Sequence, residues 1–354
     1  MTGHGNEGQE AAIVMLRLGS LVLAAVCSMG GAGTAAQDLP KRLPASPTDE
    51  TRWASDSDSQ PEYRLAQSTE AIGMPAVAQP PIEAVEAPAA PTQRGIFQGV
   101  ELNAGWMPRL ESDGLGHTNL SAAVSFGVPP FVFGTPVLIT PRAGLHLFDG
   151  PSTIDAPSSV NDFELSFATF KKFNERWSFR GSFSTGLYGD DYSLDDSDAL
   201  RFSGFAAAVY QASEEWQWLF GAAYLNRDDL SVIPVAGFIR DCGDVRYELM
   251  MPRPRVVWRL PQDEAGAERA VYLAGDLGGG AWAVQRPDGT TDTLNLSSWG
   301  VGIGYETKAG PGSLLAGKRR YELAYVFGRS IEYQNTGEDV SLDDSLVARV
   351  GWSY

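Results

Sequence analysis

A regular alternation of apolar and polar residues, repeated in short segments from about residue 96 onward, is the feature that most constrains the fold. Successive side chains of a β-strand point to opposite faces, so this alternation predicts strands with one apolar and one polar face. Clusters of Gly, Asp, Asn and Pro separate the segments and favour turns. The region 96–354 is therefore predicted to be all-β.

The alternation is clearest in four segments. The apolar and polar faces are Trp177, Phe179, Phe183 and Leu187 against Ser178, Arg180, Ser182 and Ser184; Phe163, Leu165 and Phe167 against Glu164 and Ser166; Trp299, Val301, Ile303 and Tyr305 against Ser298, Gly300, Gly302 and Gly304; and Leu346, Ala348, Val350, Trp352 and Tyr354 against Arg349, Gly351 and Ser353. A soluble sandwich or barrel has the same period. Gly, Ser and charges suit a lumen, however, and aromatic residues near strand ends suit interfacial girdles, so we favour a membrane barrel.

The turn signals divide this region into about 14 strands, with 12 to 16 allowed, in an up-and-down antiparallel transmembrane β-barrel. Beyond the N-terminal segment, no run approaches the roughly 18 apolar residues that a membrane helix needs. The segment Trp352-Ser353-Tyr354 looks like the C-terminal signal that barrel-insertion machinery reads. The expected partners are therefore this machinery, through the strand ending at Tyr354, and the lipid and lipopolysaccharide of the outer membrane.

Formal charge differs between alternate connections. Odd-numbered connections are expected to be long and external, and even-numbered ones periplasmic. The odd set, 109–116, 149–162, 189–198, 226–231, 252–255, 286–292 and 334–345, carries a charge of −13, and the even set, 128–135, 174–176, 212–215, 240–244, 261–269 and 307–320, carries −1. This asymmetry supports a bacterial outer-membrane barrel with both of its ends in the periplasm.

The N-terminal part is predicted to direct export. If translation starts at Met15, the sequence has a positive n-region, an apolar h-region over 18–26 and a small-residue cleavage site at 34–36, so 1–36 is expected to be a signal peptide. Residues 37–95 are rich in Pro, Ala, Ser, Gln and Glu without periodicity, which predicts a disordered periplasmic linker.

Composition excludes several other functions. A net charge of −17 makes nucleic acid an unfavourable partner, because phosphate binding needs clustered Lys and Arg. Cys27 falls within the expected signal peptide, which leaves Cys242 alone in the mature chain, so neither an intramolecular disulfide nor a cysteine metal site is expected. Gly278, Gly279 and Gly280 predict a bend or a close-packing site rather than a phosphate cradle, since no Lys or helix start follows.

The stretches VIPVAG (232–237), MPRPRVVWRL (251–260), LGGGAW (277–282), YELAYVFGRSIEY (321–333) and SLVARVGWSY (345–354) resemble an uncharacterised family of outer-membrane β-barrel proteins from planctomycete-type bacteria. The resemblance covers roughly residues 100 to 354. It implies a barrel fold and an outer-membrane location. It carries no activity, cofactor or catalytic residue.

Charged residues on the polar faces are the candidate functional residues. The side chains predicted to line the lumen are Glu101, Arg142, Glu164, Arg180, Arg201, Arg246, Glu248, Arg259, Asp276, Glu322 and Arg349. If they pair across strands, they fill and stiffen a narrow barrel. If they stay hydrated, they line an aqueous pore and set its selectivity.

Two acidic clusters belong to an internal repeat, residues 189–197 and 337–345, in which each copy is expected to form a long loop leading into a strand. Their carboxylates, Asp190, Asp191, Asp195, Asp196, Asp198, Glu338, Asp339, Asp343 and Asp344, are weak candidates for binding divalent cations. They lack the Asp-x-Asp-x-Asp-Gly pattern of a calcium loop, so we expect solvated acidic loops.

The predicted function is a passive diffusion channel or a structural envelope protein, with no cofactor and no catalytic residue. One alternative is a barrel-embedded enzyme acting on outer-membrane lipids, which would need a nucleophilic Ser beside a His such as His146, with a third group to orient the ring. Another alternative is a transporter of a hydrophobic solute, for which the hydrophilic 37–95 segment makes a poor hatch.

Overall fold

The computed structural model describes residues 96–111, 114–132, 135–151, 154–225, 232–262, 266–309 and 317–354. The expected signal peptide and linker lie outside these residues. The elements are β1 (Phe97–Met107), β2 (Gly116–Val132), β3 (Thr135–Asp149), β4 (Ser159–Lys172), β5 (Trp177–Gly189), a short 3-10 helix η1 (Ser197–Ala199), β6 (Leu200–Gln211), β7 (Trp216–Tyr224), β8 (Val232–Cys242), β9 (Val245–Met250), β10 (Arg255–Leu260), β11 (Glu268–Gln285), β12 (Thr291–Lys308), β13 (Lys318–Tyr333), β14 (Asp339–Leu342) and β15 (Ser345–Ser353).

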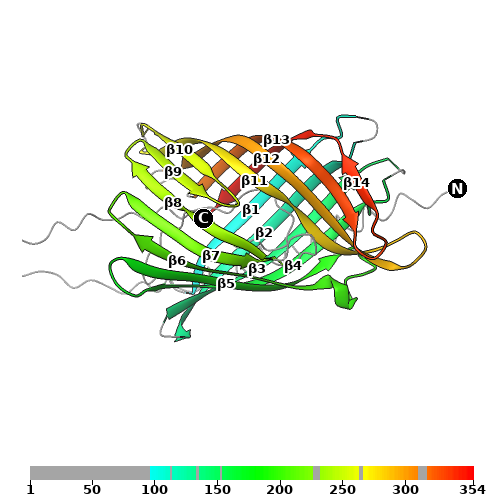
Figure 1. Cartoon of the computed structure of the whole chain (residues 1–354), viewed down its shortest axis with the longest axis horizontal. Helices are drawn as coiled ribbons and strands as arrows, with labels where there is room; N and C mark the ends of the chain where they lie inside the picture. Colours follow the sequence, from blue (N-terminus) through cyan, green and yellow to red (C-terminus); the bar gives the residue numbers. More distant parts are fainter. Residues whose placement is uncertain are drawn as a thin grey trace, which may run out of the picture. The chain divides into compact units, whose positions relative to one another are not determined.

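Hydrogen bonding joins these strands into one closed antiparallel barrel (Figure 1). Each strand from β1 to β13 pairs with its neighbour in sequence, and β15 lies between β13 and β1. The four-residue β14 is added beside one end of β13, so the ring itself has 14 strands, which confirms the fold predicted from the sequence. At the closing junction Val100 and Tyr354 exchange backbone hydrogen bonds of 3.0 and 2.9 Å.

Large exposed apolar side chains cover the outside of the ring. Trp106, Phe220, Trp299 and Tyr321 are 58%, 51%, 47% and 46% exposed, and all occupy outward register positions. A contiguous exposed apolar surface of this kind would be unfavourable in water and is what the hydrocarbon of a bilayer requires. The barrel is therefore of the outer-membrane type.

Antiparallel pairing alternates the connections between two rims. We call the rim that holds Phe97 and Ser353 the terminus rim, and the opposite rim, with connections 108–115, 150–158 and 190–199, the loop rim. Several strands extend further than predicted: β2 and β3 take up most of 128–135, and β4 begins at Ser159 within the predicted connection 149–162. The physical reason is that a polar residue at an inward position, such as Asp162, finds partners in the lumen and so does not mark a loop.

The β9–β10 hairpin is shorter than a membrane-spanning pair. Each strand has six residues, whereas a spanning strand needs about 9 to 11. Their connection, 251–254, contains Pro252 and Pro254, which cannot donate to a strand ladder, so pairing stops there. Figure 1 shows this short hairpin beside the long β11 and β12.

The loop-rim half of β11 lies inside the barrel wall. Leu277 and Ala281 occupy outward positions on β11, yet they are 7% and 0% exposed. They pack against inward-facing side chains of β6 to β9, including Phe205, Leu219 and Val235. We call residues 277–296, from the second half of β11 through the turn to the first part of β12, the plug.

The inner face of the plug is also buried. Trp282 and Leu294, which are 0% and 1% exposed, belong to an apolar cluster with Val160, Tyr188 and Tyr333. The plug therefore fills the lumen on the loop-rim side and is buried on both of its faces. The glycines at 278–280 lie where β11 enters this position, and Gly279 has φ of +134°, which favours glycine.

Among the described residues, no helix has the length and apolar character to span a bilayer.

Candidate functional site

All 11 charged residues predicted to line the lumen occupy inward register positions, on ten strands of the ring from β1 to β15. Most make interactions inside the barrel. Arg246 pairs with Glu248 at 2.8 Å, the Arg201 guanidinium donates to the Thr293 hydroxyl at 3.3 Å, and the Tyr188 hydroxyl donates to Glu164 at 2.9 Å. Of the two roles left open by the sequence, pairing within the lumen describes these contacts.

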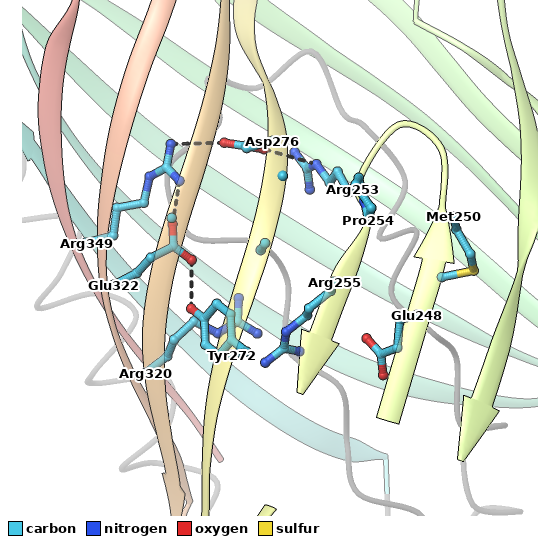
Figure 2. A pocket seen from close by; sticks show the side chains of 13 residues that line it. Glu248, Met250, Arg253, Pro254, Arg255, Tyr272, Asp276, Arg320, Glu322 and Arg349 are labelled. Carbon is cyan, nitrogen blue, oxygen red and sulfur yellow. Dashed lines mark hydrogen bonds and ion pairs between the residues drawn. The ribbon is translucent and has the colours of Figure 1, made fainter. Parts of the chain in front are cut away.

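Arg349, in the middle of β15, connects two carboxylates, one on the neighbouring strand β13 and one on the more distant strand β11. Its guanidinium lies 2.6 Å from Glu322 of β13 and 3.0 Å from Asp276 of β11. Asp276 also pairs with Arg253 at 3.3 Å, and the Tyr272 hydroxyl donates to Glu322 at 2.7 Å (Figure 2). Arg349 is 6% exposed, and its two carboxylate partners satisfy the requirement that a buried charge be paired.

A second group of charges centres on Glu306 of β12. Its carboxylate lies 2.5 Å from Arg255, 2.9 Å from Lys318 and 3.0 Å from Arg320. The Arg255 guanidinium also lies over the Tyr272 ring, 4.0 Å from its centroid. These two groups contain eight charged residues, and the Arg246–Glu248 pair brings the number to ten. We call these ten residues the arginine network: Arg246, Glu248, Arg253, Arg255, Asp276, Glu306, Lys318, Arg320, Glu322 and Arg349.

The arginine network borders a cavity of about 50 Å³ in the lumen, beside the β9–β10 hairpin. Figure 2 shows Arg349, Glu322 and Asp276 on one side of this cavity and Arg255 and Glu248 on the other. Because a water molecule needs about 10 to 15 Å³ measured in this way, the cavity has room for a few waters or one small ion.

Sequence reasoning missed half of this network. Arg255 was assigned to the connection 252–255, while Lys318 and Arg320 were assigned to 307–320, and all three belong to strands. Glu306 follows Gly300, Gly302 and Gly304 at even positions of β12 and could have been found by extending that inward face by two residues.

A chain of buried polar groups attaches the plug to the opposite wall. The Trp282 indole N–H donates to Asp162 of β4 at 2.7 Å, and His146 Nε2 of β3 lies 2.5 Å from the other oxygen of that carboxylate. His117 Nε2 of β2 lies 3.0 Å from His146 Nδ1. All four residues are at most 7% exposed. We call His117, His146, Asp162 and Trp282 the plug lock.

The distances in the plug lock fit one arrangement of protons. If both imidazoles are neutral and carry hydrogen on Nε2, His117 donates to His146 and His146 donates to Asp162. Asp162 then accepts from both His146 and Trp282, so one buried carboxylate joins two wall strands to the plug. Phe148 stacks on His117, with ring centroids 4.8 Å apart, and encloses this chain.

The lipid-modifying alternative requires a serine hydroxyl beside His146, and the plug lock places His117 at that position. His146 has a carboxylate on one ring nitrogen, as a catalytic His does, but His117 occupies the other nitrogen, where a serine hydroxyl would be required. Among the described residues, neither histidine has a hydrogen bond to a hydroxyl group.

Side chains and backbone of the loop rim contact the plug as well. Asp190 accepts from the Gln285 amide at 2.8 Å, and the Asp190 amide donates to the Ala283 carbonyl at 3.0 Å. At the plug turn, Arg286 lies 3.1 Å from Asp155 and 2.5 Å from Glu338. Three different loops therefore touch the plug.

Several of the other acidic candidates have individual structural contacts. Asp191 accepts from Asn161, Asp196 caps η1 by accepting from the Asp198 amide, and Asp339 begins β14. That amide donor holds the pKa of Asp196 below its ordinary value. In the described part of the chain, no three His, Cys, Asp or Glu side chains gather as metal ligands. The divalent-cation role of all nine carboxylates of the two acidic clusters stays a prediction.

The two copies of the acidic repeat fold differently. Residues 190–196 form turns that lead into η1, whereas 339–342 form β14 on the edge of β13. Similar sequence therefore gives two structures, because the second copy has an unpaired strand edge beside it and the first lies against the plug.

Comparison with known proteins finds likeness of fold. No protein-family model and no curated protein sequence matches the chain, so the resemblance to a planctomycete-type family stays a prediction. Among solved structures, an outer-membrane channel from Pseudomonas putida F1 is 12% identical over 76% of this chain and 100% of its own, with a TM-score of 0.37. The β domain of the Bordetella autotransporter BrkA is 10% identical over 73% of this chain and 99% of its own, with a TM-score of 0.33. A mutant of the monoaromatic hydrocarbon channel TodX is 11% identical over 72% of this chain and 88% of its own, with a TM-score of 0.28.

Proposed function

We propose that this protein is a gated channel of the bacterial outer membrane, and that the plug closes it in the conformation described here. The loop rim faces the outside, and both ends of the barrel lie toward the periplasm. A ring of 14 strands encloses more space than its inward side chains need, and barrels of intermediate size commonly use the remainder as a lumen.

The observation that carries this proposal is the way in which the plug is held. It is a continuation of two wall strands, so it is already tethered at both ends. Toward β5 its backbone pairing is limited to Ala283 with Gly189 and the adjoining Asp190 contacts. Its outer face contacts β6 to β9 through apolar side chains. On the other side, the β12 part of the plug pairs with β13 through Leu294 to Leu296, and the Gln334 amide donates to the Thr293 carbonyl at 3.0 Å. The β11 part is held to the wall mainly by side chains, so it can move on this connection while the rest of the ring keeps its ladder.

The test is single-channel recording of the full-length, folded protein in planar bilayers. Wild-type protein is expected to be closed most of the time, with brief openings. Asp162→Asn removes the charge that both donors of the plug lock address, and we expect it to raise the open probability. Asp244→Asn, in the exposed β8–β9 turn, is the matched control.

Folding of each variant is checked by the shift in gel mobility between heated and unheated samples. Discrete conductance steps, with a higher open probability in Asp162→Asn than in the wild type, support the gated channel. A folded Asp162→Asn barrel that never conducts contradicts it and favours a structural role in the envelope.

A further inference from the structure

The arginine network contains more cations than carboxylates. Six of its side chains are positive and four are negative, and three of the cations share the single carboxylate of Glu306. A fifth carboxylate, Asp241, lies 4.0 Å from Arg246. The cavity is lined by four of the arginines, Arg253, Arg255, Arg320 and Arg349, and by three carboxylates. This local excess of positive charge lies inside a chain whose net charge is −17.

The excess positive charge lies in buried side chains, where it is energetically unfavourable without a neighbouring anion. The side chains of Arg320 and Arg349 are 4% and 6% exposed, and those of Arg253 and Arg255 are 13% and 16% exposed. Buried charge in a medium of low dielectric constant is unfavourable unless opposite charge compensates it. In the ion pairs described above, the six cations of the arginine network share its four carboxylates.

Two of the arginines that line the cavity have a donor without a partner in the protein. The Nε atoms of Arg255 and Arg349 are buried and have no hydrogen-bond acceptor in the protein. Guanidinium groups match the oxygen spacing of phosphate and carboxylate, because they present N–H donors in a planar fork. Several guanidinium groups around a small space are therefore suited to a tetrahedral or planar oxyanion.

We propose that this cavity binds a small oxyanion, a phosphate or carboxylate group, and that the channel favours solutes that carry one. The part concerning solutes rests on the proposed channel, whereas the binding part rests on the cavity. The space of about 50 Å³ accommodates one such group and leaves the remainder of a larger solute in the lumen. Glu248, Asp276 and Glu322 oppose a second anion and limit the site to one.

Binding is measured first, by calorimetric titration of inorganic phosphate, and separately of acetate, into folded full-length protein in detergent at constant ionic strength. Arg255→Gln is expected to weaken binding by about tenfold or more, because it removes a charged donor. Glu248→Gln is expected to strengthen binding severalfold, because it removes a repelling charge. Arg240→Gln is the control, since this substitution removes the same charge on the outward face of β8, where Arg240 lies over the Trp216 ring.

Ion selectivity is measured second, from the reversal potential across bilayers in a salt gradient, with Asp162→Asn used to open the channel. Anion preference that falls with Arg255→Gln supports the proposal. Equal loss of binding with Arg240→Gln, or no change with Arg255→Gln and Glu248→Gln, overturns the site. Conductance with cation preference and no phosphate or acetate binding overturns the site and leaves the channel. Binding without conductance leaves the site and refutes the channel.

Discussion

Replacing Trp282 by Phe should shift the plug toward the open state without unfolding the barrel. The change keeps an aromatic ring in the apolar cluster around Val160 and Tyr188 and removes the indole N–H that donates to Asp162 over 2.7 Å. Hydrogen bonds to charged groups contribute about 1.5 to 3 kcal/mol when they are buried. With Trp282 0% exposed and Asp162 1% exposed, we take about 2 kcal/mol for this bond.

If the closed state alone loses about 2 kcal/mol of stabilising free energy, the ratio of open to closed channels rises roughly 30-fold, because each 1.4 kcal/mol is a factor of ten. The assay is the open probability of single channels. Trp299→Phe is the control, since that ring is 47% exposed on the outward face. An unchanged open probability in folded Trp282→Phe protein would refute the assignment of this hydrogen bond to the lock.

Three further results are expected. Glu306→Gln should destabilise the barrel by about 3 kcal/mol or more in urea titrations of protein in vesicles, because it leaves three buried cations without their shared carboxylate, whereas Glu268→Gln, in an exposed pair, should change stability by less than about 1 kcal/mol. Gly304→Ala should lower the temperature at which the barrel loses its compact gel mobility, because the added Cβ would clash with the Tyr272 ring, whereas the Cβ of Gly300→Ala meets its nearest atom at 3.5 Å and should change this temperature little. Cys242, which is exposed at the terminus rim, should react with a membrane-impermeant maleimide only after the outer membrane of cells is permeabilised, and reaction in intact cells would reverse the proposed orientation.

The fold could be predicted because one face of almost every strand meets lipid. That environment tolerates no charge, so alternation is written into each strand, and the inward register of residues such as Arg180 and Arg349 follows by counting in twos. The partners of those residues could not be predicted in the same way. Pairing of Arg349 with Asp276 joins residues 73 positions apart and depends on strand register and on the tilt of the barrel.

The plug could not be predicted from alternation because it departs from it. The run Ala281-Trp282-Ala283-Val284 is apolar at every position, a pattern typical of a strand buried on both faces. Together with Gly278 to Gly280, this run was the available signal that β11 leaves the wall. The partner of Trp282, Asp162, lies 120 residues away and has no local pattern that marks it.

The short β9–β10 hairpin explains how a wall strand can enter the lumen without breaking a ladder. Beyond the Met251 amide, which donates to the Ala236 carbonyl at 3.1 Å, β8 extends past the hairpin toward the loop rim. β11 likewise extends past its last hairpin contact, the Gly275 amide with the Pro254 carbonyl at 2.8 Å. The two extended segments need not pair with each other, so β11 can pass inside β8.

The strength of the closed state should therefore reside in the plug lock and not at the plug turn. Arg286 pairs there with Asp155 and Glu338, but those carboxylates are 41% and 58% exposed, and ion pairs to such exposed groups contribute about 0 to 1 kcal/mol. Arg286→Gln should then raise the ratio of open to closed channels by no more than about fivefold, well below the effect of Trp282→Phe. Single-channel recording of both variants under the same salt compares them directly. A larger effect of Arg286→Gln would mean that the acidic loops, and not the buried chain from Asp162 to His117, control opening.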